Sequence, residues 1–231
     1  MKPFKLAASL AVVLSAAVPF AAFAQEEESP YSWEVTAVSD YVWRGVSQSD
    51  ENPTGQAGFT YTSPVGLYAG VWASGVDFGG GDPDFEVDGF IGYNVDFSDS
   101  VNFDIMLNRY TYPDAGELNF NELITTTTFA DAYSLTVAYS DDFGGADTDA
   151  WYVAGGASFA LPQDFSLDLS VGRSLFEDEY GEDYTDWSVG VSRSWGLFSA
   201  ALAYVGTDGN GRDAFGDLAD DRLVLTLSVG Q

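Results

Sequence analysis

Carboxylates and arginines are the side chains from which this chain could build a reactive or binding site, because it contains no histidine and no cysteine. Their absence rules out Ser-His-Asp and Cys-His catalysis, as well as metal sites made of Cys and His. Paired carboxylates could still act as general acid and base, but among 36 acids such pairs arise without any catalytic role. We therefore expect no enzyme, no catalytic residue, no bound metal and no cofactor.

The charged residues between positions 31 and 46 all fall on one face of an extended chain. Across residues 31–46, Glu34, Asp40 and Arg44 fall on one face, and the opposite face is mostly aromatic or aliphatic. This alternation is typical of a β-strand with different surroundings on its two sides. It predicts one strand over 31–46, with Asp40 and Arg44 as a candidate charge pair near the external mouth of a barrel.

The first 24 residues have the pattern of a secretory signal peptide. A positively charged start is followed by an apolar stretch from Leu6 to Val18 and by the small-residue cleavage pattern Ala22-Phe23-Ala24. We expect residues 1–24 to be cleaved, leaving a short acidic leader at 25–30 and a single β-barrel domain at 31–231.

The mature chain would be strongly acidic. Cleavage removes both lysines and leaves six basic residues, all arginine, against 36 acids, a formal charge of −30 (6 − 36). Such a charge repels the phosphates of nucleic acid, so we expect no nucleic-acid partner.

From residue 31 onward, short alternating runs are separated by turns, and no run has the period or the caps of a helix. Counted along the chain from residue 31, the connection after the first run is long, the connection after the second is tight, and this alternation continues to the last run. This predicts an all-β fold: a single antiparallel up-and-down transmembrane β-barrel with short periplasmic turns and longer, acidic extracellular loops. The twelve expected strands are 31–46, 55–62, 67–77, 85–96, 101–111, 120–130, 133–140, 149–160, 165–175, 184–195, 197–206 and 221–230.

Alternation alone does not separate a membrane barrel from a soluble β-sandwich. Aromatic residues gather at both ends of the expected strands, as in the two interface belts of a membrane barrel, although core aromatics of a sandwich are the alternative. At the long-loop end they are Trp43, Phe85, Tyr110, Tyr112, Phe120, Tyr139, Trp151, Tyr184, Trp187 and Tyr204. After residue 24 no run has the roughly 18 consecutive apolar residues of a membrane helix, so membrane entry requires a closed barrel.

The polar faces would line the lumen of such a barrel. Twelve strands give a bore between the filled barrels of about eight strands and the open channels of about sixteen, so we expect a narrow pore. Its lining is mostly acidic, which favours cations over anions. The pore-lining candidates are Glu34, Asp40, Arg44, Glu86, Asp88, Asp104, Glu122, Asp168 and Asp186.

Two arginines have the opposite parity. Arg109 and Arg173 fall on the apolar face close to the long loops, where an outward charge costs little. Each could bind the phosphates of outer-membrane lipids or lipopolysaccharide, or pair with a nearby loop acid, since the arginine fork suits both.

The chain resembles a known family. The stretches SDYVWRGVSQSDENPTGQAGFTY at 39–61, GLYAGVWASGV at 66–76 and FEVDGFIGY at 85–93 are similar to the TorF-family putative porins of Gram-negative bacteria, as are YPDAGELNFNEL at 112–123 and DYTDWSVGV at 183–191. The resemblance implies a small outer-membrane β-barrel with a porin-like role, and it carries over no active-site residues. The chain departs from the usual barrel pattern in ending at Gln231 instead of an aromatic residue.

We expect an outer-membrane channel for the passive diffusion of small solutes, with a preference for cations. One alternative is a structural or binding barrel with a largely occluded lumen, whose acidic loops at 141–149 and 177–183 bind divalent cations or a surface partner. Neither loop has the spacing of an EF-hand. A soluble periplasmic β-barrel is the other alternative.

Overall fold

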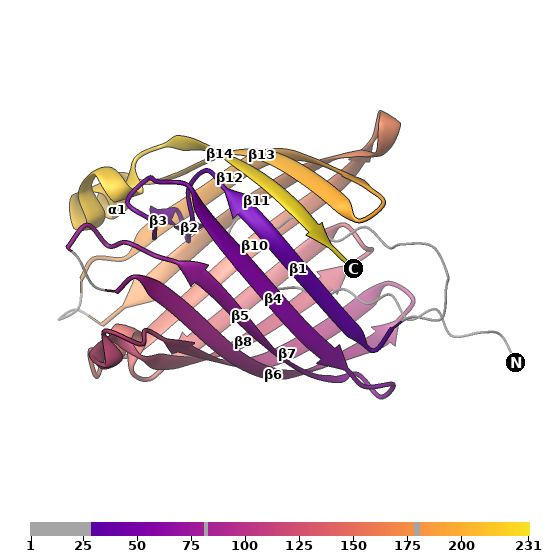
Figure 1. The fold of residues 1–231 in the computed structure, drawn as a ribbon, viewed down its shortest axis with the longest axis horizontal. Helices are drawn as coiled ribbons and strands as arrows, with labels where there is room; N and C mark the ends of the chain where they lie inside the picture. Colours follow the sequence, from indigo (N-terminus) through magenta and orange to yellow (C-terminus); the bar gives the residue numbers. More distant parts are fainter. Residues whose placement is uncertain (1–28, 81–82, 178–180) are drawn as a thin grey trace, which may run out of the picture.

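The computed structural model describes residues 29–80, 83–177 and 181–231, so the expected signal peptide and most of the acidic leader lie outside the described residues. Twelve strands form one closed antiparallel barrel in the order β1-β14-β13-β12-β11-β10-β9-β8-β7-β6-β5-β4 (Figure 1). The barrel strands are β1 (Tyr31–Val38), β4 (Thr54–Thr62), β5 (Leu67–Gly75), β6 (Phe85–Ser98), β7 (Val101–Thr111), β8 (Phe120–Phe129), β9 (Tyr133–Ser140), β10 (Ala150–Leu161), β11 (Phe165–Phe176), β12 (Tyr184–Trp195), β13 (Phe198–Thr207) and β14 (Arg222–Gly230).

The barrel closes where the first strand meets the last. Val38 of β1 lies opposite Thr54 of β4 on one side and opposite Thr226 of β14 on the other. At the start of β1, the backbone of Trp33 exchanges two hydrogen bonds with Gln231, at 2.9 and 3.0 Å. Closure leaves no unpaired strand edge, as a barrel in a membrane requires.

The connections alternate in length, which confirms that prediction. One end of the barrel, the short-turn end, carries the tight turns, and the long-loop end carries the longer connections. Figure 1 shows the end of β14 at the right and the helix α1 (Gly209–Phe215) at the left, so these two ends are opposite. The single-turn 3-10 elements are η1 (Gly116–Leu118), η2 (Phe143–Gly145), η3 (Pro162–Asp164) and η4 (Gly216–Ala219).

Eleven expected strands agree with the structure to within two residues at each end, but the first does not. The strand expected over 31–46 ends at Val38, and the chain then forms a separate hairpin from β2 (Val42–Trp43) and β3 (Val46–Ser47). The alternating pattern continues past Val38, but its two faces no longer mark lipid and lumen, because the chain has left the wall.

The expectation that no segment is helical is also wrong for one loop. The helix α1 begins after Asp208, whose side chain accepts a hydrogen bond from the backbone N–H of Gly211 at 3.2 Å. This N-cap satisfies a donor that the helix itself leaves free and offsets the poor helix propensity of the two glycines in the first turn. None of the described helices is long and apolar enough to cross a membrane.

The outer and inner faces of the barrel differ sharply. Outward side chains such as Ile91 are apolar and 57% exposed, whereas their inward neighbours include Asp88, which is 0% exposed. A soluble barrel or sandwich buries its apolar side chains and exposes its polar ones, so the observed distribution is the reverse of both soluble alternatives. The outer face is suited to lipid.

The expected aromatic belt at the long-loop end is only partly present. Phe85, Trp151 and Tyr204 are exposed on the outer face. Five others are instead inside the barrel, because they share the inward register of neighbouring polar residues or lie on the hairpin and the loops. These five are Trp43, Tyr110, Tyr112, Phe120 and Tyr184.

Candidate functional site

The segment between β1 and β4, residues 39–53, folds into the barrel from the long-loop end, and we call it the luminal segment. Figure 1 draws its strands β2 and β3 within the barrel. Arg44 and Gly45 form the two-residue turn of the hairpin, with φ of 49° and 81°. Positive φ at both central residues is the type I′ geometry that matches the twist of a hairpin. It is costly for arginine, which shows that contacts elsewhere hold the turn in place.

The luminal segment contacts strands around the whole circumference of the barrel. The ring of Tyr41 meets Trp72 of β5 edge-on at 5.5 Å. Val42 packs in one cluster with residues of β13 and β14, and Val46 packs in another with Tyr184 of β12. The segment therefore occupies the long-loop end of the lumen.

Arg44 makes an ion pair and two cation–π contacts inside the barrel. Its Nη2 donates to both carboxylate oxygens of Glu122, at 2.7 and 2.8 Å. The guanidinium carbon lies 4.3 Å from the centroid of the Trp43 ring and 4.1 Å from that of Tyr152. Burial acts to lower the pKa of Arg44, but the charge and hydrogen bonds of Glu122, together with the phenols of Tyr110 and Tyr152, outweigh it and hold the pKa above its ordinary value. Arg44 therefore stays charged, between a carboxylate and two aromatic faces.

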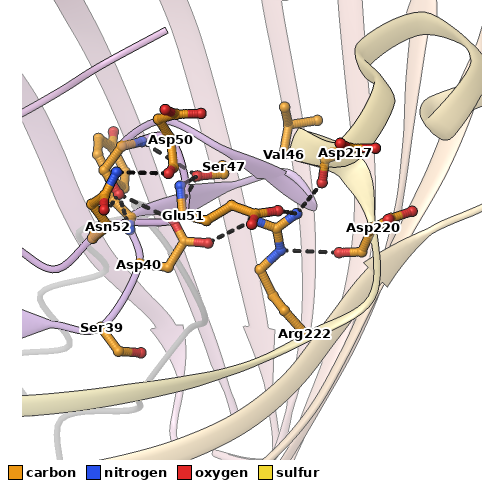
Figure 2. Close-up of polar contacts among 12 residues, drawn as sticks. Ser39, Asp40, Val46, Ser47, Asp50, Glu51, Asn52, Asp217, Asp220 and Arg222 are labelled. Carbon is orange, nitrogen blue, oxygen red and sulfur yellow. Dashed lines mark hydrogen bonds and ion pairs between the residues drawn. The ribbon is translucent and has the colours of Figure 1, made fainter. Parts of the chain in front are cut away.

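A second network holds the base of the hairpin (Figure 2). One oxygen of Asp40 accepts hydrogen bonds from the hydroxyls of Ser47 (2.6 Å) and Ser49 (3.0 Å). Its other oxygen accepts from Nη1 of Arg222 at 2.7 Å, and Arg222 also pairs with Glu51 at 3.2 Å. The network ties the segment to the first residue of β14.

The expected pair of Asp40 with Arg44 is not formed. Asp40 pairs with Arg222 and Arg44 pairs with Glu122, because the turn at Arg44 carries its side chain away from Asp40 and across the lumen. The sequence reasoning missed Arg222, although a signal existed. Arg222 has the same parity as the inward residues Thr226 and Ser228 of the last strand.

The phenol of Tyr41 makes a third attachment. Its hydroxyl donates to Oε1 of Glu86 at 3.0 Å. Burial and the charges of Glu86 and Asp88 raise the pKa of Tyr41, so the phenol keeps its proton and remains a donor. Asp88 accepts from the amide of Asn108 at 3.0 Å through one oxygen, and its other oxygen has no hydrogen-bond partner in the part of the chain that the structure describes.

The nine expected pore-lining residues all lie on the lumen side, seven on the inward face of barrel strands and two on the luminal segment. Three of the acids, Glu34, Asp104 and Asp168, are each the fourth residue of their strand counted from the short-turn end. Asp168 accepts from the hydroxyls of Ser158 and Ser192, both at 2.7 Å. We call these three acids the acidic zone, and no hydrogen bond or ion pair joins them to the luminal segment among the described residues.

No arginine balances this acidic zone within the described part of the chain. Arg44 and Arg222 are paired at the long-loop end, Arg109 and Arg173 point outward, and Arg212 belongs to α1. The remaining arginine, Arg193, has outward parity on β12 and stacks over the outward ring of Phe165, with 5.2 Å between guanidinium carbon and ring centroid.

The two outward arginines near the long-loop end, Arg109 and Arg173, differ in their partners. Arg173 donates to Thr185 at 3.0 Å and pairs with the loop acid Asp183 at 3.5 Å. Arg109 has no acidic partner within 4.0 Å among the described residues, and it borders an outer groove of about 350 Å³ with Ile91 and Leu107.

Metal-binding clusters are absent from the part of the chain that the structure describes: no group of three acids is close enough to hold an ion. In the acidic loop at 141–149, one oxygen of Asp142 accepts from the backbone N–H of Asp147 at 2.8 Å. Part of the other acidic loop, 177–183, lies outside the described residues.

A family profile described as "Bacterial protein of unknown function (Gcw_chp)" matches residues 24–229. The chain belongs to the Gcw_chp family. This match does not carry the TorF name, so the resemblance to TorF-family porins stays a prediction. A search of curated protein sequences found no significant match.

Solved porin structures share the fold of this Gcw_chp member. The KdgM porin superposes with a TM-score of 0.56 at 7% identity, covering 86% of this chain and 97% of that chain. The NanC porin gives a TM-score of 0.55 at 9% identity, covering 87% and 97%. At such identities the similarity shows the fold alone, that of a small porin-like barrel.

Proposed function

We propose that this protein is a narrow outer-membrane channel for the passive diffusion of small solutes, and that it favours cations. The observation that carries the proposal is the acidic zone of Glu34, Asp104 and Asp168, a set of luminal carboxylates with no arginine beside them. Carboxylates that line a pore attract cations and repel anions. The TorF resemblance and the porin-like fold support the same function.

The width of the passage limits the solutes to small ones. Inward residues of β10 to β12, such as Ser158, Ser170 and Ser188, are small, polar and partly exposed to solvent. On β5 to β7 the inward residues include Trp72, Phe90 and other large side chains that fill their side of the lumen. The passage would therefore run along the wall of β10 to β12.

Reconstitution into a planar bilayer tests this proposal. With a KCl gradient across the bilayer, a cation-favouring channel gives a reversal potential of the sign set by potassium. The double variant Asp104→Asn and Asp168→Asn removes two of the three charges of the acidic zone and should move the reversal potential toward zero. Asp213→Asn, on the exposed face of α1, is the matched control and should leave it unchanged. An anion-selective wild-type channel would contradict the proposal.

A structural barrel with an occluded lumen is the second candidate, and the luminal segment is the observation that favours it. If the segment never leaves the long-loop end, the barrel conducts nothing. Folded protein, identified by heat-modifiable gel migration, that gives no current in the bilayer would support this candidate over the channel.

Arg109 is the residue we propose for contact with outer-membrane lipid or lipopolysaccharide. It faces outward at the long-loop end beside an apolar groove and has no carboxylate partner in the described chain. Arg109→Gln should weaken the co-purification of lipopolysaccharide with the barrel, whereas Arg173→Gln, which removes an arginine already paired with Asp183, should change it less. Equal losses in both variants would count against a specific role of Arg109.

A further inference from the structure

We propose that the wall around Arg44 is a binding site for guanidinium-bearing solutes, which the luminal segment fills with its own side chain. The site consists of Glu122 on β8 with Tyr152 on β10 and Asp186 on β12, and we call it the guanidinium site. The inference deepens the proposed diffusion function by naming a class of cation that the lumen recognises. Its geometry stands whether or not the barrel conducts.

The chemistry of the site is selective for a flat, delocalised cation. Glu122 is 1% exposed, and both its oxygens contact the guanidinium. The ring of Tyr152 provides a stacking surface, with its centroid 4.1 Å from the guanidinium carbon of Arg44. A planar guanidinium can stack on the ring while it donates to the carboxylate, which a compact ammonium cannot do as well.

Supporting contacts hold both groups in position. The hydroxyl of Tyr110 donates to Oε2 of Glu122 at 3.1 Å, and that of Tyr152 donates to Oδ1 of Asp186 at 3.1 Å. These residues come from four different barrel strands, not from the luminal segment. The site therefore belongs to the wall and would remain when the segment moves.

Arg44 does not satisfy the site fully. Only one of its nitrogens, Nη2, contacts Glu122, and its buried Nε has no hydrogen-bond partner among the described residues. On the wall, the buried Oδ2 of Asp186 also has no hydrogen-bond partner within the described part of the chain. A free guanidinium is not tied to a hairpin, so it could turn to give Glu122 two nitrogens and still present a third to Asp186.

The backbone at Arg44 is strained as well. Its φ of 49° is unfavourable for a residue with a Cβ, and the contacts of its side chain offset that cost. Because the backbone of Arg44 is strained and its Nε is unused, a guanidinium-bearing solute can replace its side chain in the guanidinium site. Replacement would free the tip of the hairpin and widen the long-loop end of the lumen.

The variant Arg44→Asn empties the site while keeping the turn. It converts the turn to Asn-Gly, the pair that type I′ hairpins favour, so the hairpin should persist without the guanidinium. We expect guanidinium chloride at low millimolar concentration to raise the melting temperature of this variant by several degrees in detergent, because a ligand that binds only the folded state stabilises it. Urea at the same concentration is the matched probe, since it has nearly the same shape and no charge, and sodium chloride controls for ionic strength.

Two further proteins complete the experiment. Arg44→Asn combined with Glu122→Gln should lose the response to guanidinium, and the wild type should show none at that concentration because Arg44 already occupies the site. Guanidinium should also reduce the current through Arg44→Asn in the bilayer. If Arg44→Asn does not form the barrel, Arg44→Gly accepts the same backbone and takes its place.

An equal shift with urea, or a shift that persists without Glu122, would overturn the proposal. The failure of the diffusion function is distinguishable from the failure of this site. If guanidinium stabilises the barrel but the barrel carries no current, the guanidinium site is supported and the diffusion function is contradicted. If the barrel conducts but guanidinium neither stabilises it nor blocks the current, the diffusion function is supported and the guanidinium site is contradicted.

Discussion

Replacing Arg222 with glutamine should release the luminal segment from the barrel wall. The side chain of Arg222 is 12% exposed and pairs with Asp40 at 2.7 Å and Glu51 at 3.2 Å. It also donates to the backbone carbonyls of Asp217 (2.6 Å) and Asp220 (3.0 Å). Glutamine is uncharged and shorter, so the carboxylate of Asp40 would stay buried without a cation.

The contacts that survive set the size of the effect. Removing one partner of a buried ion pair costs about 3–5 kcal/mol. The cost is lower here because Asp40 keeps its bonds from Ser47 (2.6 Å) and Ser49 (3.0 Å). Glu51 is 52% exposed, and an exposed pair contributes only about 0–1 kcal/mol. We therefore expect attachment of the segment to weaken by about 2–3 kcal/mol, a rise of about 30- to 150-fold in the detached population.

The absence of cysteine makes this population measurable. A single cysteine in place of Val46, which is 6% exposed, would react with a thiol reagent only when the segment detaches. When opening and closing are fast compared with labelling, the labelling rate follows the open population. The rate in Val46→Cys with Arg222→Gln should therefore exceed that in Val46→Cys alone by the same about 30- to 150-fold.

Arg173→Gln is the matched control for this experiment. Arg173 also pairs with an aspartate, but the pair is outward and both side chains are exposed. Its removal should change the labelling of Cys at position 46 by no more than a few-fold. Equal labelling rates with and without Arg222, or equal acceleration by both substitutions, would refute the role of Arg222 as an anchor.

Two other predictions concern the turn and the loop helix. Gly45→Ala should detach the hairpin tip, since a Cβ there would lie 2.6 Å from Cγ2 of Thr207 at a φ of +81°, and the same labelling assay measures it. Asp208→Ala should cost about 1 kcal/mol by removing the N-cap of α1, seen as faster hydrogen exchange of the helix. Burial acts to raise the pKa of Asp208, but N–H donors of Gly211 and Thr185 outweigh it and lower the pKa. A lowered pKa in the folded protein stabilises the fold at pH values above the ordinary pKa of an aspartate. That stabilisation is lost as the pH falls through the lowered pKa. The amide hydrogen-exchange rate of α1, corrected for the pH dependence of intrinsic exchange, should therefore rise as the pH is lowered in the wild type. In Asp208→Ala the corrected rate should stay nearly constant.

The barrel itself could be predicted because the direction of a strand side chain is a local property. Parity alone placed Glu34, Asp104 and Asp168 inside and Arg109 outside, as the structure has them. Loop length then set which strand ends lie together. Neither step needs any knowledge of contacts between distant residues.

The luminal segment could not be found by the same reasoning. Its turn is Arg-Gly, and arginine is a poor residue for the first position of a type I′ turn, so the usual Asn-Gly or Asp-Gly signal is missing. The partners are also remote. Arg44 and Glu122 are 78 residues apart, and Asp40 and Arg222 are 182 apart. Such pairs are set by how the closed barrel brings strands together, which the alternating pattern does not encode.

The placement of the arginines separates two properties of the lumen. Both inward arginines, Arg44 and Arg222, are paired with carboxylates at the long-loop end, where they hold the luminal segment. Neither compensates the acidic zone nearer the short-turn end. Access would then depend on the arginines, and charge preference mainly on the acids that no arginine pairs with. Loss of either inward arginine would also leave one more uncompensated carboxylate in the lumen, so a looser segment and a stronger preference for cations are expected together.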